Sequence, residues 1–401
     1  MISAAGNAVV DLGDVPFGRG AYLLFRSALR RLAPGERVEV RGRDPALAVE
    51  LRAYCRAAGA EVEWCSGWPG VVARVRGCAA TPAATRAGRA NPLSPDAIAD
   101  QPPASWGLAP RGALVDAGVP AFSFPLAEKD VVWSDDAPRL YAQAASAQWD
   151  PATAIPWHAP LDHPDDVEDA VVQIMTYLVE NETAALMVPA RFVAGIHPHF
   201  REVMQLLAIQ VADEARHVEV FTRRGLLRRE ALGLSTAGGQ RSLQTLLEEP
   251  DFAQATFLLS VLGEGTFLAL LRFLHEHAPD QVTATAVRLA AQDEARHVAF
   301  GLGHLQRQVN RDAHLRARLA RAVERRHEVL RHTAGLNQEV HDALVLLAAG
   351  SWEPARLATG HDRVTALAAA MDDGRKHRLA RLGFTPGEAA SLSELHTRNF
   401  M

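Results

Sequence analysis

The hexapeptide DEARHV occupies residues 213–218 and returns unchanged at residues 293–298. In an α-helix, residues three positions apart share a face, so the Glu and the His of each copy point in the same direction. These pairs are Glu214 with His217 and Glu294 with His297. A helix face that carries one carboxylate and one imidazole offers two metal ligands, and two such helices predict a shared metal site.

Each copy follows a helical stretch that carries acid among apolar residues. The stretch FAQATFLLSVLGEGTFLALLRFL before the second copy contains one acid, Glu264, and a lone buried carboxylate is costly unless it is paired or metal-bound. The stretch VVQIMTYLVENETAALMV before the first copy offers Glu180 and Glu182. Glu182 shares its face with apolar residues and precedes Glu214 by an interval close to that between Glu264 and Glu294. We therefore expect Glu182 to be the ligand, with Glu180 as the alternative.

The predicted ligand set combines four carboxylates with two imidazoles. Such a set suits iron, with manganese as the alternative, whereas a structural zinc site would want thiolates or more imidazoles. The near-symmetry of the two halves predicts two metal ions. The predicted ligands are Glu182, Glu214, His217, Glu264, Glu294 and His297.

From about residue 165 to residue 310, this pattern resembles the ferritin-like di-iron carboxylate superfamily, whose fold is an all-α bundle. The resemblance implies that Asp213 anchors His297 and that Asp293 anchors His217. It also implies that Arg216 and Arg296 neutralise these aspartates at the periphery of the site.

Four features set the chain apart from other members of the superfamily and leave the oxygenases and oxidases. Phe221 and Gly301 stand where a radical-storing reductase subunit would place a tyrosine, and Ala290 stands where arylamine N-oxygenases often have a further histidine. The chain lacks the Cys-x-x-Cys iron site of rubrerythrins and is long for a ferritin.

The resemblance implies a non-heme di-iron enzyme that activates O2 to hydroxylate, desaturate or N-oxygenate a small organic metabolite. Iron handling or peroxide reduction, as in ferritins and rubrerythrins, is the alternative. The expected cofactors are two iron ions (Fe2+/Fe3+), and the expected partners are O2, a small-molecule substrate and, where the reaction needs it, an electron donor or reductase. Four residues one turn from the ligands are pocket candidates, with plain core packing as the alternative: Gln210, Phe221, Phe267 and Leu268.

Residues 1–78 predict a small α+β domain with the order βαβαββ, which resembles the TusA/SirA-like sulfur-carrier fold through PGERVEVRGRDPALAVELRAYCRAAGAEVEW. That family carries its reactive cysteine in a Cys-Pro-x-Pro element at the start of the first helix. Gly18 stands at this position here, and Cys55 falls inside the second predicted helix, where a buried structural thiol is expected. We therefore expect a docking, scaffolding or specificity module that lacks sulfurtransferase activity.

The rest of the chain divides by composition. Residues 79–134 are rich in Pro, Ala and Gly without sustained periodicity, which predicts a linker. The predicted bundle spans residues 135–310, and residues 311–401 predict extra helices that cover the substrate pocket or form a homodimer contact.

The bulk properties indicate a globular protein of 401 residues with a formal charge of −5. This charge predicts no nucleic-acid partner, and no uninterrupted apolar run reaches the ~18 residues that span a bilayer. Cys55, Cys65 and Cys78 are too few for a disulfide framework. We expect a cytoplasmic protein without a signal peptide.

Overall fold

The computed structural model describes residues 8–33, 36–65, 71–76, 84–91, 97–331 and 338–400. Pro34, Gly35 and Cys78 lie outside these ranges. The chain forms two compact units, which are described separately. One comprises Met1–Arg86 with Leu114–Val119, and the other comprises Ala87–Ala113 with Pro120–Met401.

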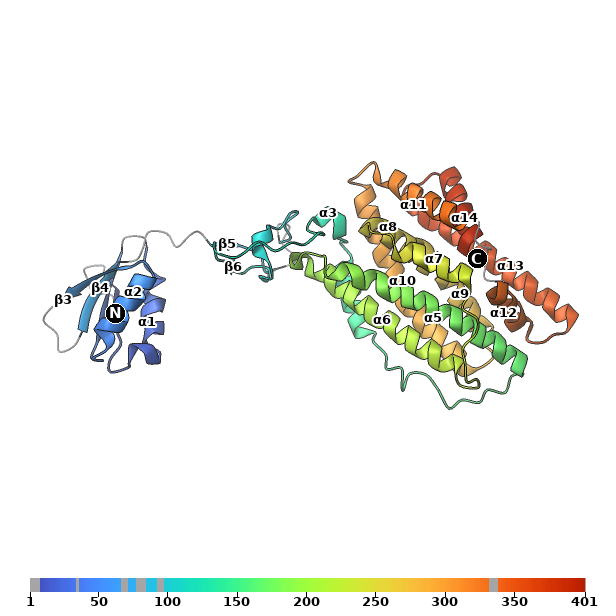
Figure 1. The fold of residues 1–401 in the computed structure, drawn as a ribbon, viewed down its shortest axis with the longest axis horizontal. Helices are drawn as coiled ribbons and strands as arrows, with labels where there is room; N and C mark the ends of the chain where they lie inside the picture. The colour runs from blue at the N-terminus through green and yellow to red at the C-terminus, as the bar shows by residue number, and fades with distance from the viewer. Residues whose placement is uncertain are drawn as a thin grey trace. The chain divides into compact units, whose positions relative to one another are not determined.

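The first unit contains the predicted βαβαββ order (Figure 1). Its elements are β1 (Ala8–Asp11), η1 (Phe17–Arg19), α1 (Ala21–Leu29), β2 (Arg37–Gly42), α2 (Leu47–Ala57), β3 (Glu61–Cys65) and β4 (Val71–Arg76). The strand order is β1-β2-β4-β3, with β1 parallel to β2 and the other pairs antiparallel. Phe25, Leu51 and Cys55 from the two helices pack in the core with Val38 and Val40 from β2. The α+β prediction for this part of the chain is confirmed.

The interval 79–134, predicted as a linker, contains short elements where it is described. These are β5 (Thr85–Arg86), β6 (Leu114–Val115), η2 (Ala104–Trp106) and α3 (Lys129–Val132). Residues 87–113 and 120–134 belong to the helical unit. The Trp106 ring lies 5.0 Å from the His199 ring, and Arg111 forms a buried ion pair with Glu202. This part of the chain has no periodic apolar face, so it contacts the helical unit through single aromatic and charged side chains.

The second unit is a helical bundle with additional helices, as predicted. The bundle helices are α5 (Asp165–Val193), α6 (Arg201–Gly225), the continuous run of α8 (Phe252–Thr256), η4 (Phe257–Glu264) and α9 (Gly265–Glu276), and α10 (Gln281–Val309). The other helices are α4 (Ala137–Ser146), η3 (Pro198–Phe200), α7 (Ala237–Leu247), α11 (Leu315–Leu330), α12 (Gln338–Ala349), α13 (Pro354–Arg381) and α14 (Pro386–Phe400). In Figure 1 the bundle helices run side by side, and α11, α13 and α14 gather beside them.

The run Phe252–Glu276 is the most apolar helix of the bundle. By length and composition alone it could cross a membrane, but 72% of its most apolar window is buried inside the unit. Its N-terminus is capped by Asp251, which accepts a hydrogen bond from the Gln254 backbone N–H. Phe257, Val261 and Leu271 from this run are fully buried. A core helix accounts for its apolar composition.

A buried ion-pair network ties the ends of three bundle helices together. Arg224 of α6 donates to both oxygens of Glu168 of α5, at 2.8 and 2.9 Å. It also donates to Asp280, which caps α10, at 2.8 Å, and to Thr283 at 2.7 Å. Burial by itself raises the pKa values of Glu168 and Asp280. Arg224, helped by His163 at Glu168 and by Thr283 at Asp280, outweighs burial and holds both pKa values below their usual range. The network therefore stabilises the bundle while both carboxylates are ionised.

We predict that Arg224→Gln lowers the thermal midpoint of the helical unit at pH 7. We also predict that the midpoint of this variant falls less between pH 7 and pH 3 than that of the unchanged protein. Removing one partner from a buried ion pair costs about 3–5 kcal/mol. Because the folded pKa values are depressed, the stabilisation is present above the unfolded values of about 4 and is lost as the pH falls through the folded values. Thermal unfolding of both proteins at pH 7 and pH 3, without added metal, measures the difference. Equal midpoints at pH 7 would contradict this role.

Candidate metal centre

The structure brings the six predicted ligands together inside the bundle. Their donor atoms form two overlapping groups, and all atoms of a group lie within 4.8 Å of one another. One group comprises Glu182, Glu214, His217 and Glu294, and the other comprises Glu214, Glu264, Glu294 and His297. Every member is buried. Glu214 and Glu294 belong to both groups, so both carboxylates would be available to two ions.

Helix geometry explains the arrangement. The Glu-x-x-His pairs of α6 and α10 each put a carboxylate and an imidazole on the inner face of their helix, while α5 adds Glu182 and η4 adds Glu264. One Glu from each of two helices and Glu-x-x-His from each of the other two is the ligand pattern of ferritin-like di-metal bundles. Glu180, the alternative on α5, is half-buried and belongs to neither group.

Glu264 ends a segment that the sequence did not predict, because η4 is wound as a π-helix. Such segments are rare and are frequently found at functional sites. The wider winding needs space on the neighbouring helix, and Gly301 of α10 provides it. A Cβ at Gly301 would come within 2.5 Å of the Ser260 Cβ. The glycine one turn after His297 therefore lets α10 approach the π-segment closely.

Buried atoms without hydrogen-bond partners indicate that the cluster fits metal ions. Among the described residues, the atoms Glu182 Oε1, Glu214 Oε1, Glu264 Oε2, Glu294 Oε2 and His297 Nδ1 have no partner. His297 Nδ1 lies 3.0 Å from Glu214 Oε1, but the pair lacks hydrogen-bond geometry. Buried polar atoms are rarely left unsatisfied, and oxygen and imidazole nitrogen are suitable ligands for iron and manganese.

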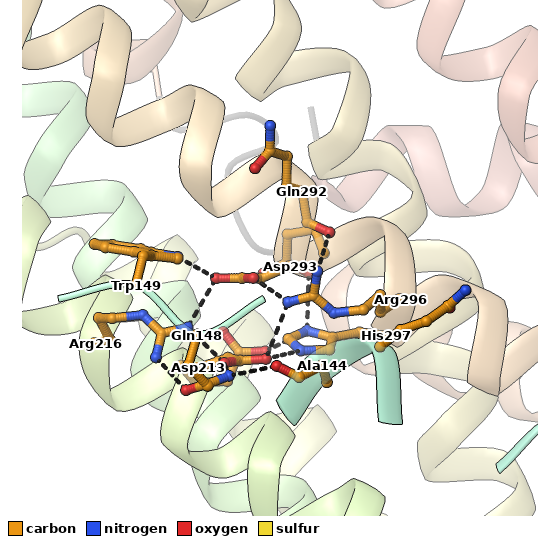
Figure 2. Close-up of polar contacts among 12 residues, drawn as sticks. Ala144, Gln148, Trp149, Asp213, Arg216, Gln292, Asp293, Arg296 and His297 are labelled. Carbon is orange, nitrogen blue, oxygen red and sulfur yellow. Dashed lines mark hydrogen bonds and ion pairs between the residues drawn. The ribbon is translucent and has the colours of Figure 1, made fainter. Parts of the chain in front are cut away.

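Each imidazole contacts the aspartate of the opposite helix. His217 Nε2 lies 3.2 Å from Asp293 Oδ2, and His297 Nε2 lies 3.3 Å from Asp213 Oδ2. Figure 2 shows His297 beside Asp213 within this layer of polar contacts. An Nε2–H that donates to a carboxylate leaves the Nδ1 lone pair for a metal. In both residues Nδ1 is the atom that faces the glutamates.

Two arginines connect the aspartates to each other. Arg216 donates to Asp213 at 2.5 Å and to Asp293 at 2.9 Å. Arg296 forms an ion pair with Asp293 and lies 3.6 Å from Asp213. The positive charges therefore lie outside the aspartates, as the resemblance implied.

The loop after α4 supplies two contacts that the sequence did not reveal. Gln148 donates to Asp213 at 2.8 Å and accepts from Arg216 at 2.7 Å. Trp149 donates to Asp293 at 2.8 Å (Figure 2). The Trp149 ring lies nearly parallel to the His217 ring, with 6.5 Å between the ring centres. The sequence predicted packing for Trp149 but no hydrogen bond. No motif marks a loop residue whose partner lies more than sixty residues away.

The electrostatics of the cluster follow from its burial. Burial, and then the charges of Glu214 and Glu294, raise the pKa of Glu182 well above its usual range. Burial and the same two glutamates also raise the pKa of Glu264. Burial lowers the pKa of His217, but the surrounding carboxylates outweigh it and raise that pKa well above its usual range. The cluster concentrates negative charge that two divalent cations would balance.

A pocket reaches the cluster from one side. It has about 670 Å³ of empty volume, part of it open to solvent, and Glu182, Glu264 and Glu294 line it. Phe267, one of the four pocket candidates, lines this pocket too, and its ring stacks against Tyr177 at 5.8 Å. Three of the clustered glutamates therefore form part of the wall of this pocket.

The other three pocket candidates have different positions. Gln210 donates to Glu264 Oε1 at 3.0 Å and lines a smaller pocket of about 250 Å³. Phe221 is fully buried, and its ring lies 6.2 Å from that of His217. Leu268 is half-buried against the hydrophobic core. Helical spacing identified residues close to the ligands. It did not show which of them line the pocket, as Phe267 does, and which pack in the hydrophobic core, as Phe221 and Leu268 do.

No protein-family profile and no curated protein matches the chain. Solved structures of an R2-like ligand-binding oxidase overlap the chain in part. The form with a metal cofactor after photoconversion is 18% identical, covers 67% of this chain and 94% of its own, and has a TM-score of 0.43. A variant of that oxidase with an Fe/Fe cofactor is 18% identical, covers 64% and 94%, and has a TM-score of 0.44. A likeness at this level establishes neither a family nor an activity.

We predict that Asp213→Asn and Asp293→Asn each weaken metal binding about 10- to 100-fold, the usual effect of losing a partner that orients a ligand. Asparagine keeps the shape but removes the charged acceptor of the imidazole N–H. Competition with a chelator for bound Fe(II) measures the affinity. Asp166→Asn, an exposed position on α5, is the control. Unchanged affinity in both variants would show that these contacts do not support metal binding.

Proposed function

We propose that this protein is a non-heme di-metal oxygenase or oxidase, with two iron ions as its cofactor and manganese as the alternative metal. Its reaction is the hydroxylation, desaturation or N-oxygenation of a small organic molecule. One observation carries the proposal: three of the clustered glutamates line a pocket that a small molecule can enter. An iron-storage site has no need of such a pocket.

The residues divide the work as follows. Glu182 and His217 would hold one ion, Glu264 and His297 would hold the other, and Glu214 and Glu294, which belong to both groups, would serve both ions. Three further residues support the ligands. Asp213 and Asp293 keep the imidazoles oriented, and the amide of Gln210 keeps one oxygen of Glu264 in place.

The chemistry follows from this assignment. When bound, the metal ions supply the electron transfer that activates O2. In a hydroxylation, one oxygen atom enters the substrate C–H bond and the other leaves as water, which takes two electrons and two protons from an external reductant. The pocket holds the substrate against the glutamate side of the cluster, and its apolar side chains reduce contact between the substrate and water.

The N-terminal unit has a separate proposed role as a docking, scaffolding or specificity module. Gly18 occupies the position of the sulfur-carrier cysteine, and its N–H donates to Glu50 at 2.9 Å. Cys55 is buried, which raises the pKa of its thiol to about 11. A protonated, buried thiol is a poor nucleophile, so these features argue against sulfur transfer.

We predict that the protein, loaded anaerobically with Fe(II), binds two irons per chain and then consumes O2 in a rapid phase. Glu182→Ala should bind fewer irons because it loses a ligand. Glu180→Ala, two residues away on the same helix, should still bind two. Iron analysis and stopped-flow oxygen measurements provide the values.

Two results would contradict the proposal. Trace iron binding by the unchanged protein would exclude a di-iron cofactor. Accumulation of many irons per chain in large assemblies would instead favour an iron-handling protein. Loss of iron in Glu180→Ala but not in Glu182→Ala would reassign the ligand on α5.

A further inference from the structure

The pocket beside the metal cluster has a second polar region, formed by the C-terminal helices. Arg326 of α11 and His396 of α14 line the same pocket as Glu182, Glu264 and Glu294. Both are almost completely buried, with 7% and 3% of their surfaces exposed. The pocket therefore combines a carboxylate cluster with a buried cation.

Neighbouring helices hold Arg326 in position. One guanidinium nitrogen donates to the Ser242 carbonyl at 3.1 Å and to its hydroxyl at 3.2 Å. The guanidinium also lies close enough to the phenol of Tyr177 for the two groups to affect each other's pKa. Tyr177 lies five residues before Glu182 on α5, which is about 7 Å along the helix axis. The cation therefore lies near a level of the pocket about one and a half helical turns before Glu182 on α5.

Three arginines lie close enough to His396 to affect its protonation. Burial, followed by the charges of Arg375, Arg326 and Arg378, lowers the pKa of His396 well below its usual range. His396 is therefore neutral at pH 7. Burial lowers the pKa of Arg326 to about 9, so that its guanidinium is still charged at neutral pH.

Apolar side chains form much of the remaining lining. They come from α7, η4, α9 and α13: Leu243, Leu246, Leu258, Leu259, Phe267 and Met371. An apolar body would bury its surface against these side chains. A buried guanidinium favours a carboxylate, which accepts two parallel hydrogen bonds from it.

We propose that the substrate of this site is an organic acid, whose carboxylate is bound by Arg326 and whose hydrocarbon part extends across the apolar lining toward Glu182, Glu264 and Glu294. Arg326 is thus a specificity-determining residue that places the carboxylate away from the metal ligands. This inference rests on the proposed function, because the bound acid is a substrate only if the site catalyses a reaction. The binding of the acid can be measured separately.

The test compares acids with their neutral counterparts. Straight-chain carboxylates from butanoate to dodecanoate, and the corresponding primary amides, are titrated calorimetrically into the full-length protein at pH 7, both with and without bound iron. We expect at least one acid to bind about tenfold or more tightly than its amide, the difference that a charge-assisted hydrogen bond provides. We expect this preference in both forms of the protein.

Variants then assign the preference to one residue. Arg326→Gln should remove the difference between acid and amide, and Arg326→Lys should retain part of it because it keeps the charge without the planar fork. Arg325→Gln is the matched control, since Arg325 is the preceding residue on α11 and is exposed and ion-paired to Glu249. Circular dichroism and iron content verify that each variant is folded. If Arg326→Gln does not fold, the acid–amide comparison and Arg326→Lys decide the question.

The outcomes separate this inference from the proposed function. Equal binding of every acid and its amide, or a preference that survives Arg326→Gln, overturns the inference. A preference that appears only with iron and does not depend on Arg326 means that the acid binds the metals, so the proposed function stands and this inference fails. Failure to bind iron, with an Arg326-dependent preference for acids, overturns the proposed function and leaves the acid site in place.

Discussion

Four carboxylates buried within a few ångströms of one another are the constraint on which the rest of the bundle depends. Moving one ionised carboxylate out of water costs several kcal/mol even after the protein relaxes, and Glu182, Glu214, Glu264 and Glu294 repeat this cost at one place. Cations must therefore be nearby. The proposed metal ions would supply them at the centre, with the imidazoles as neutral ligands, and the atoms without hydrogen-bond partners mark where the ions would bind.

The surroundings of the cluster alternate in charge from the centre outward. Carboxylates contact imidazoles, imidazoles contact Asp213 and Asp293, and the aspartates contact Arg216 and Arg296. Each group is held from two sides, which restricts its rotation and orients the ligands. On the side of the pocket, these successive contacts between charged and polar groups are absent among the described residues. There, Glu182, Glu264 and Glu294 face apolar side chains and the buried Arg326.

Much of the architecture followed from local patterns. The βαβαββ order of the N-terminal unit and the helices of the bundle were predicted because apolar periodicity and capping residues act within a few residues of one another. The phase of α5 pointed to Glu182, which the structure places in the cluster while Glu180 stays outside it. Composition said less about the structure of residues 79–134. Trp106 and Arg111 contact the bundle there through single side chains, and no periodic sequence pattern indicates these contacts.

The sequence by itself determined which residues share a helix face, because the 3.6-residue period fixes that relation between near neighbours. The repeated hexapeptide thus identified both Glu-x-x-His pairs before any helix was placed beside another. The tertiary structure decided everything that depends on two helices meeting: the π-winding before Glu264, the contacts of Trp149 and Gln148 with the aspartates, and the position of Arg326 in the pocket. These features join residues that are far apart in the chain, and their relation is set by packing and not by local period.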